Sequence, residues 1–340
     1  MNTESSRLLW RVTVSLVLVA GALGAGWAVS QGAQQRSSLA TAFDALPAST
    51  FTIDYTSWSD IEGSLDDAGL AGLTTRSVVA PLDAEMQDVL GWATSELDWE
   101  VYGRIDGGAI SALGLGEISA ELVRDSFAEK GSVVDGDPRV FQLDDDADVS
   151  RDFASTFKWV RVVPERHLVL AAEDQRSLDA ATAVVVGGDR SLLNVRMLAA
   201  LADRFDAATS ALLLTRQLFC RDSTIEPDSA EERQLAAVLG SSGRLADADW
   251  GGRAIFAGDP QRIIFAAAFG SDAVAREQLR VRRPLTSGPF VGRDGQVADS
   301  LRDLRAAESD GVVSFDFALT PSSEQFMTVT GPVLFAGCAP

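Results

Sequence analysis

The chain has 340 residues, with 29 Lys and Arg against 49 Asp and Glu, so its formal net charge is −20. Hydrophobic residues make up 46% and charged residues 23%, which is typical of a globular protein and not of a disordered chain. An acidic chain repels the phosphates of nucleic acids and of anionic lipids, and we therefore exclude a nucleic-acid-binding function. A chain of this length can form two domains, each with its own core.

The first thirty residues predict a membrane segment. An uncharged stretch, Val12–Val29, follows Arg7 and Arg11 and is 18 residues long. About 20 apolar residues span a bilayer as a helix, whereas the apolar part of a signal peptide has about 7–15. Basic residues before a spanning segment stay in the cytoplasm. We therefore expect residues 1–30 to be a single-pass membrane anchor with its N-terminus in the cytoplasm.

A cleaved signal peptide is the alternative interpretation of this segment. Ala28 and Ser30 are small residues at the two positions that a signal peptidase reads. The mature protein would then be secreted instead of anchored. In both cases the chain after residue 30 is extracytoplasmic, where its cysteines meet an oxidising environment.

Composition divides the exported part into a stalk and two modules. Residues 31–48 are expected to form a short polar stalk. A first α+β module is expected over residues 49–150 and a second over residues 151–340. The aspartate-rich segment 133–152 marks the boundary between them.

The predicted elements of the first module begin with a strand over residues 50–58, where apolar residues alternate with polar ones. A helix with apolar positions at helical spacing follows over residues 83–97. A second strand is predicted over residues 99–105. A second helix is predicted over residues 117–131, with a glycine at its end.

The second module continues this mixture of elements. An amphipathic helix is predicted over residues 191–205, a buried strand over 210–219 and a helix over 229–240. Two strands, over 311–319 and 324–331, are predicted near the C-terminus. Hairpins mixed with helices indicate an α+β fold with mainly antiparallel sheets and packed helices, and not a doubly wound parallel sheet.

Two segments of the second module resemble one another. "PERHLVLAA" begins at Pro164 and "PQRIIFAAA" at Pro260, an offset of 260 − 164 = 96 residues. Each follows a short apolar strand and precedes a helix-like segment, which is the pattern of a hairpin followed by a helix. The match indicates a hairpin–helix duplication, although short apolar segments also match by chance.

The chain has two cysteines, Cys220 and Cys338. An even number of cysteines in an exported domain predicts disulfide pairing. We therefore expect a Cys220–Cys338 disulfide that pins the C-terminal tail to the domain. The alternative, a nucleophilic cysteine, needs a histidine or a similar base beside it.

Catalytic motifs are scarce. The single histidine, His167, lies in an apolar stretch, so a structural or surface role is expected, and a zinc site is excluded. Ser155 and Lys158 fit the Ser-x-x-Lys pattern of penicillin-recognising enzymes, but the companion motifs Ser-Asp-Asn and Lys-Thr-Gly are missing. A solvated turn is the better interpretation. We therefore expect no catalytic, cofactor or metal site, and no cofactor.

An acidic cluster has part of a calcium-loop pattern. Asp144, Asp146 and Asp148 have the alternate spacing of such a loop. Val149 and Ser155 occupy the positions that an EF-hand gives to glycine and to a bidentate glutamate. An EF-hand is therefore excluded, and an acidic surface loop is expected.

Two further groups have both a structural and a binding interpretation. Arg280, Arg282 and Arg283 form either a solvated helix end or a contact for an anionic partner. The tryptophans outside the N-terminal segment are expected in the core, where aromatic rings bury most area, and not around a pocket: Trp58, Trp92, Trp99, Trp159 and Trp250.

The chain resembles a group of single-anchor or exported actinobacterial proteins of unknown function. The resemblance covers most of the exported part and rests on the N-terminal segment and on four stretches: "ALPAST" with "TIDYTSW", "SLLNVRMLAAL", "ATSALLLTRQLFC" and "GPVLFAGC". It implies paired cysteines. It implies no substrate, cofactor or active site, and no functional residue is transferred from it.

We therefore expect a membrane-anchored extracytoplasmic protein that is a non-enzymatic binding or interaction module of the cell envelope. Its partners would be the membrane, through the N-terminal helix, and an envelope protein or a small ligand. The alternative is an exported hydrolase of cell-wall polymer that uses paired carboxylates, which would face each other about 5–9.5 Å apart across a cleft.

Overall fold

The structure, a computed structural model, describes residues 37–61, 77–144, 147–223, 243–288, 296–320 and 333–338. Three predicted elements lie outside these residues: the N-terminal membrane segment, the helix over 229–240 and the strand over 324–331. None of the helices in the described ranges is both long and apolar enough to cross a membrane. The fold described below is that of the unit Ser38–Pro340.

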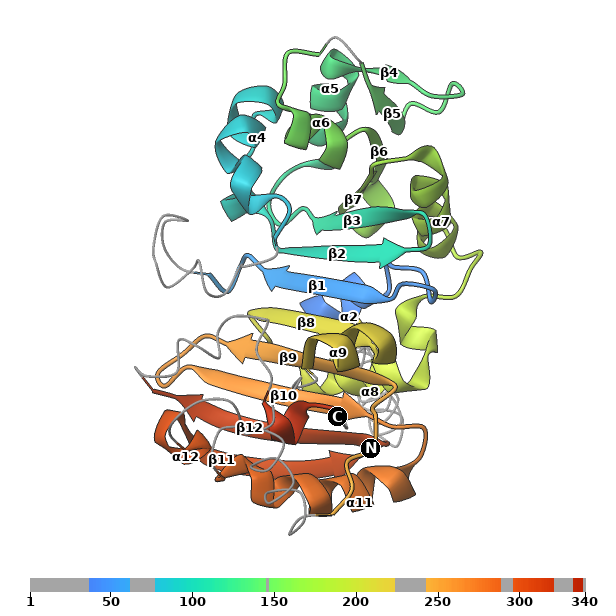
Figure 1. The fold of residues 1–340 in the computed structure, drawn as a ribbon. Helices are drawn as coiled ribbons and strands as arrows, with labels where there is room; N and C mark the ends of the chain where they lie inside the picture. Colours follow the sequence, from blue (N-terminus) through green and yellow to red (C-terminus); the bar gives the residue numbers. More distant parts are fainter. Residues whose placement is uncertain are drawn as a thin grey trace, which may run out of the picture. The chain divides into compact units, whose positions relative to one another are not determined.

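A sheet of twelve strands dominates this unit (Figure 1). The strands are β1 (Thr52–Ser57), β2 (Trp99–Ile105), β3 (Gly108–Gly114), β4 (Gly131–Val133), β5 (Val140–Leu143), β6 (Trp159–Val163), β7 (Leu168–Ala172), β8 (Ser210–Thr215), β9 (Trp250–Phe256), β10 (Arg262–Ala268), β11 (Leu301–Ser309) and β12 (Val312–Leu319). Their order across the sheet is β11-β12-β10-β9-β8-β1-β2-β3-β7-β6-β5-β4.

All neighbouring strands in this sheet are antiparallel. The predicted α+β fold with antiparallel strands is therefore confirmed. The expected module boundary at residue 150 lies between β5 and β6, which are hydrogen-bonded to each other. The sheet is thus continuous across that position.

Helices pack on both faces of the sheet. The α-helices are α2 (Ser38–Phe43), α4 (Asp83–Leu90), α5 (Ala120–Lys130), α6 (Arg151–Thr156), α7 (Gln175–Val185), α8 (Arg196–Arg204), α9 (Arg216–Ser223), α11 (Asp272–Arg282) and α12 (Val297–Ser300). Short 3-10 helices are η1 (Ala80–Leu82), η2 (Thr94–Glu96), η3 (Pro164–Arg166), η4 (Leu192–Asn194), η5 (Arg283–Thr286) and η7 (Leu334–Ala336).

Three apolar clusters form the core. One cluster joins one face of the sheet to α2, α7 and α8. On the opposite face, α4, α5 and α6 cover the strands from β3 to β6. The strands from β8 to β12 are covered on that same face by α9, α11 and the C-terminal tail. Side chains alternate between the faces of a strand, so neighbouring residues of one strand belong to different clusters.

β1 differs from the strand predicted from its sequence. The alternation predicted one buried face, but all six residues of Thr52–Ser57 are buried. β1 lies in the middle of the sheet, between β8 and β2. The polar residues of its second face, Thr52, Asp54 and Thr56, are therefore enclosed as well.

The segment expected to form a stalk, residues 31–48, differs from the prediction. From Ser38 onward this segment belongs to the folded domain, because α2 begins there. Leu39, Phe43 and Leu46 are buried in the cluster that α2 shares with α7 and α8. Leu39 and Phe43 lie four residues apart on α2 and therefore on one helical face. Packing thus outweighs the polar composition of the flanking residues.

The strand predicted over residues 210–219 is shorter in the structure. Only Ser210–Thr215 forms a strand, β8, and the chain continues as helix α9 from Arg216. A short apolar run does not distinguish a strand from a buried helix. The ring of Phe219 in α9 packs on Gly251 of β9, where a Cβ atom would lie 2.4 Å from the ring.

A common arrangement of elements is present in both halves of the sheet, and the first half adds β4, β5 and α6 to it. β1, β2, β3, α5, β6 and β7 correspond in order to β8, β9, β10, α11, β11 and β12, and both halves extend outward from the central β1–β8 pair. Corresponding elements have equal lengths for the β1/β8, β2/β9, β3/β10 and α5/α11 pairs. A local two-fold axis between β1 and β8 therefore relates the halves (Figure 1).

Backbone hydrogen bonds repeat with this symmetry. The N–H of Asp98 donates to the carbonyl of Gly114 at 3.0 Å, and the N–H of Asp249 donates to that of Ala268 at 2.9 Å. Each aspartate precedes the tryptophan that begins β2 or β9. Across the centre, Ser57 donates to Thr209 at 2.8 Å, and Thr215 donates in return to Phe51 at 3.1 Å. The repeat thus extends to single residues.

The two matched segments each form a hairpin followed by a helix, as predicted: β6–β7 precedes α7, and β9–β10 precedes α11. The symmetry of the sheet, however, does not pair these two hairpins. Pro164 lies in the β6–β7 hairpin, which corresponds to the β11–β12 hairpin of the other half. Pro260 lies between β9 and β10, which correspond to β2 and β3. The offset of 96 residues therefore pairs hairpins that are not equivalent, whereas β2 and β9 begin 250 − 99 = 151 residues apart.

Candidate functional site

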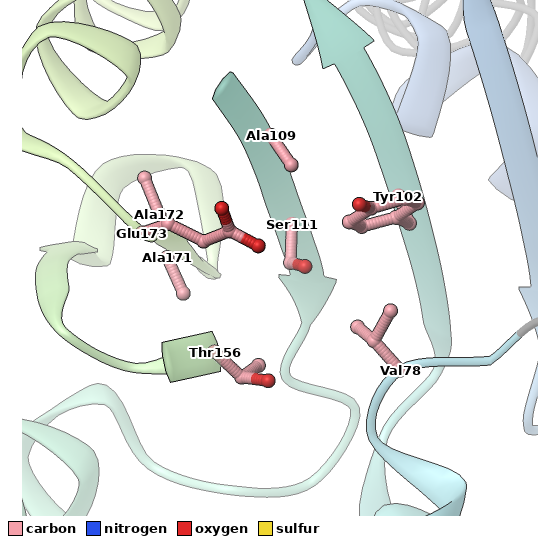
Figure 2. Close-up of a pocket in the computed structure, with 8 residues that line it drawn as sticks. All are labelled: Val78, Tyr102, Ala109, Ser111, Thr156, Ala171, Ala172 and Glu173. Carbon is pink, nitrogen blue, oxygen red and sulfur yellow. The ribbon is translucent and has the colours of Figure 1, made fainter. Parts of the chain in front are cut away.

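A cavity of about 60 Å³ lies on the sheet face that α6 covers. It is lined by Val78, Tyr102, Ala109, Ser111, Thr156, Ala171, Ala172 and Glu173, all labelled in Figure 2. β2, β3 and β7 provide its floor, the end of α6 provides one wall, and the segment before η1 provides another. Only one half of the repeat contributes to it.

Strand register positions the floor of the cavity. Ser111 of β3 pairs with Tyr102 of β2 on one side and with Ala171 of β7 on the other. Opposed residues of neighbouring strands point to the same face, so these three side chains form one row. Ser111 is buried, whereas Glu173, just beyond the end of β7, is exposed. The cavity therefore reaches solvent at Glu173.

The polar groups of the cavity are three hydroxyls and one carboxylate. Figure 2 shows the carboxylate of Glu173 and the hydroxyl end of Tyr102 directed toward the middle of the site, next to Ser111. Thr156 approaches from α6. Of the eight lining residues, none carries a positive charge. The remaining walls are alanines and Val78, so the cavity is polar on one part of its surface and apolar on the rest.

The equivalent place in the other half is filled. Tyr102, Ser111 and Ala171 are each the fourth residue of their strand, and the fourth residues of the corresponding strands are Arg253, Phe265 and Phe315. The same pairing holds there, because Phe265 is opposite both Arg253 and Phe315.

Aromatic rings occupy this second place. Phe265 lies 5.2 Å from Phe335 and 6.1 Å from Phe317, measured between ring centroids. Phe317 corresponds to Glu173, since each lies five residues after the start of its strand. The cavity is therefore not a consequence of the topology. It exists because one half carries Ser, Ala and Glu where the other carries phenylalanines.

Glu100 lies beside the cavity, two residues before Tyr102 and on the same face. Its carboxylate accepts hydrogen bonds from the hydroxyl of Ser77 at 2.5 Å and from the N–H groups of Val78 and Val79 at 2.9 and 3.3 Å. Burial raises the pKa of Glu100 to about 7, although these hydrogen bonds act in the opposite direction. Because Val78 lines the cavity, Glu100 holds one of its walls in place.

The predicted disulfide is present between Cys220 of α9 and Cys338, with their Cα atoms 5.1 Å apart. The carboxylate of Asp247 lies within 4.8 Å of both sulfurs. Since the two sulfurs are bonded to each other, they are not thiolates and do not form a metal site with Asp247. Asp247 instead pairs with Arg216 at 2.6 Å.

The arginines of the predicted cluster have different surroundings in the structure. Arg280 is exposed and pairs with Glu277 at 2.5 Å, as a solvated helix end predicts. Arg282 is fully buried under the C-terminal tail, and burial lowers its pKa to about 10. Arg282 was therefore wrongly grouped with the solvated residues. Helical spacing explains the difference, since residues two apart on a helix point to different sides.

The remaining residues that the sequence analysis considered make contacts within the fold. Ser155 is exposed on α6, and the Nζ of Lys158 donates to the carbonyl of Leu143 at 3.0 Å. The Nε2 of His167 lies 2.8 Å from the carbonyl oxygen of Gly116. Asp144 accepts a hydrogen bond from Ser132 at 2.8 Å, and Asp146 lies outside the described residues. The tryptophans are part of the core or packed against it: Trp58, Trp92, Trp99, Trp159 and Trp250.

Sequence reasoning missed the residues that line the cavity. The signal that could have indicated them is the alternation Glu100, Tyr102, Arg104 in "WEVYGRI", which gives this strand one polar face. Which residues of other strands lie opposite that face depends on register, which the sequence does not show.

Comparison with protein-family models, with curated proteins and with solved structures finds no match to this chain. The functional assignment therefore depends on the site itself.

Proposed function

We propose that this protein is an extracytoplasmic binding module of the cell envelope, held at the membrane by residues 1–30, and that the cavity at Ser111 is its binding site. The observation that carries the proposal is the difference between the two halves. Packed aromatic rings fill one place, and its equivalent is open and carries polar groups. Large residues stabilise a core, so an open polar cavity at a position that can be filled favours a binding role.

The disulfide supports the extracytoplasmic location. Disulfides persist in oxidising compartments and are rare in the cytosol. Cys220 and Cys338 lie 118 residues apart in sequence, and their bond joins the tail to α9. This agrees with an exported domain that follows either a retained anchor or a cleaved signal.

A non-enzymatic role is favoured by the groups in the cavity. Glu173 is the one carboxylate among its lining residues. Glycoside hydrolysis by the usual mechanism needs two carboxyl groups on either side of the scissile bond. The alternative, a carboxylate-dependent hydrolase of cell-wall polymer, has no support from this cavity.

The experiment that tests the proposal is mass spectrometry of the protein purified from its own membranes. Under denaturing conditions, a full-length mass two hydrogens below the reduced value supports both the anchor and the disulfide. Loss of about thirty residues identifies a secreted protein instead. Under native conditions, additional mass that disappears in Ser111→Val supports the binding role. A bound molecule that remains in Ser111→Val contradicts the assignment of the site.

A further inference from the structure

We infer that the cavity receives an alkylammonium group, the positively charged end of a lysine side chain or of a small primary amine. This inference rests on the proposed binding function and names the ligand chemistry of the same site. It follows from the polar groups of the cavity, from its charge, and from its size and opening.

The polar groups of the cavity match the donors of an ammonium group. Ser111 and Thr156 offer hydroxyl oxygens, and Glu173 offers the oxygens of its carboxylate. A primary ammonium has three N–H donors and no acceptor. Three acceptors from β3, α6 and the end of β7 are thus available to three donors, and the hydrogen bond to Glu173 would be charge-assisted.

The negative charge of the site disfavours an anionic ligand. An anion in the cavity would lie near Glu173 with no lining cation to compensate for the repulsion. Three ionisable residues share the sheet face of Tyr102 outside the lining: Glu100 and Asp54, which are buried, and Arg104, which is exposed and lies opposite Ala109. The lining itself carries only the carboxylate of Glu173 as a charged group. The whole chain carries a net charge of −20, which attracts cations from solution.

The size of the cavity limits the ligand to an end group. A volume of about 60 Å³ is far below the roughly 300–1,000 Å³ of pockets that enclose drug-sized molecules. A sugar ring is too large, whereas an ammonium with its adjoining methylene groups has the right dimensions. The rest of such a ligand would extend into solvent through the open side of the cavity at Glu173.

The apolar walls match a methylene chain. Val78, Ala109 and Ala171 present aliphatic groups beside the polar ones. Tyr102 forms a further wall, with its hydroxyl end toward the middle of the site. An alkylammonium is apolar along its stem and charged at its tip, so it is complementary to both parts of the lining.

The test uses the full chain, purified in detergent at low ionic strength, and three probes: n-butylammonium, n-butanol and Nα-acetyl-lysine amide. Binding is followed by calorimetry and by the NMR shifts of the Ser111 and Thr156 amides. We expect n-butylammonium to bind and to shift both amides, with n-butanol at least tenfold weaker. Tighter binding of the lysine amide than of n-butylammonium identifies a peptide side chain as the source, and weaker binding identifies a free amine.

Two variants with the same change of charge complete the test. Glu173→Gln should weaken n-butylammonium binding at least tenfold. Asp179→Asn, an exposed position on α7 outside the cavity, should leave it unchanged. Equal binding of n-butanol and n-butylammonium overturns the ligand class but leaves the binding site intact. Absence of a shift at Ser111 and Thr156 with every probe overturns the inference. A native ligand that still copurifies with Ser111→Val in native mass spectrometry overturns the proposed site itself.

Discussion

The guanidinium of Arg282 in α11 donates to the carbonyl oxygen of Gly337 at 2.7 Å and thereby binds the C-terminal tail to the domain. Its other donors reach the carbonyls of Phe335 at 3.1 Å and Ala246 at 2.7 Å, and the side chain of Gln278 at 3.1 Å. Arg282 is fully buried. The tail therefore depends on a buried cation as well as on the disulfide of Cys338.

Arg282→Met should lower the free energy of unfolding by about 3–5 kcal/mol, because it removes the donors of several buried carbonyl oxygens. The measurement is equilibrium unfolding in urea. Arg280→Met is the matched control, since Arg280 lies two residues earlier on the same helix and is exposed. A cost for Arg282→Met no larger than that of the control would show that the tail does not depend on this side chain.

Reduction of Cys220–Cys338 should lower the free energy of unfolding by about 2–5 kcal/mol, because the bond restricts the unfolded chain. Urea unfolding with and without dithiothreitol measures this effect. The double variant Cys220→Ser/Cys338→Ser should match the reduced protein and should not respond to dithiothreitol. A response of the double variant to the reductant would mean that the effect has another origin.

Glu100 should make stability depend on pH. The pKa of Glu100 in the folded state, about 7, lies above its ordinary value of 4.5, so the folded state binds the proton more tightly than the unfolded state. The stabilisation is complete below about pH 4.5 and is lost as the pH rises through about 7. Relative to Glu100→Gln, the wild type should therefore lose about 3 kcal/mol between pH 4.5 and pH 8.

This pH dependence is measured by urea unfolding of both proteins across that range. Glu117→Gln, at an exposed position, serves as the control and should run parallel to the wild type. A Glu100→Gln curve that is also parallel to the wild type would contradict the assignment of the titration to Glu100.

Equivalent positions in the two halves should respond differently to truncation. Phe265→Ala should lower the free energy of unfolding by about 3–5 kcal/mol, because it opens a cavity among packed rings. Ser111→Ala should cost about 1 kcal/mol or less, because its side chain already faces a cavity. Thermal and urea unfolding of both variants tests the contrast. Similar costs at the two positions would mean that the cavity in the first half is packed as tightly as the second.

The sequence alone determined the class of the fold and the cysteine pairing. Alternating apolar residues and capped amphipathic stretches depend on local periodicity, and they predicted β2, α5 and β12. The pairing of Cys220 with Cys338 followed because an exported chain with two cysteines has one possible intramolecular disulfide. Local patterns gave wrong predictions where tertiary packing decides the structure. Helix α2 begins at Ser38 within the expected stalk, and helix α9 begins at Arg216 within the expected strand.

Only the tertiary structure decided the symmetry and the site. The repeat is visible through strand order and hydrogen bonds, whereas few residues besides Asp98-Trp99 and Asp249-Trp250 are shared between its halves. The cavity depends on register, which brings together Tyr102, Ser111 and Ala171 from three strands. Register is fixed by the burial of whole faces across the sheet, a long-range effect that no single segment contains.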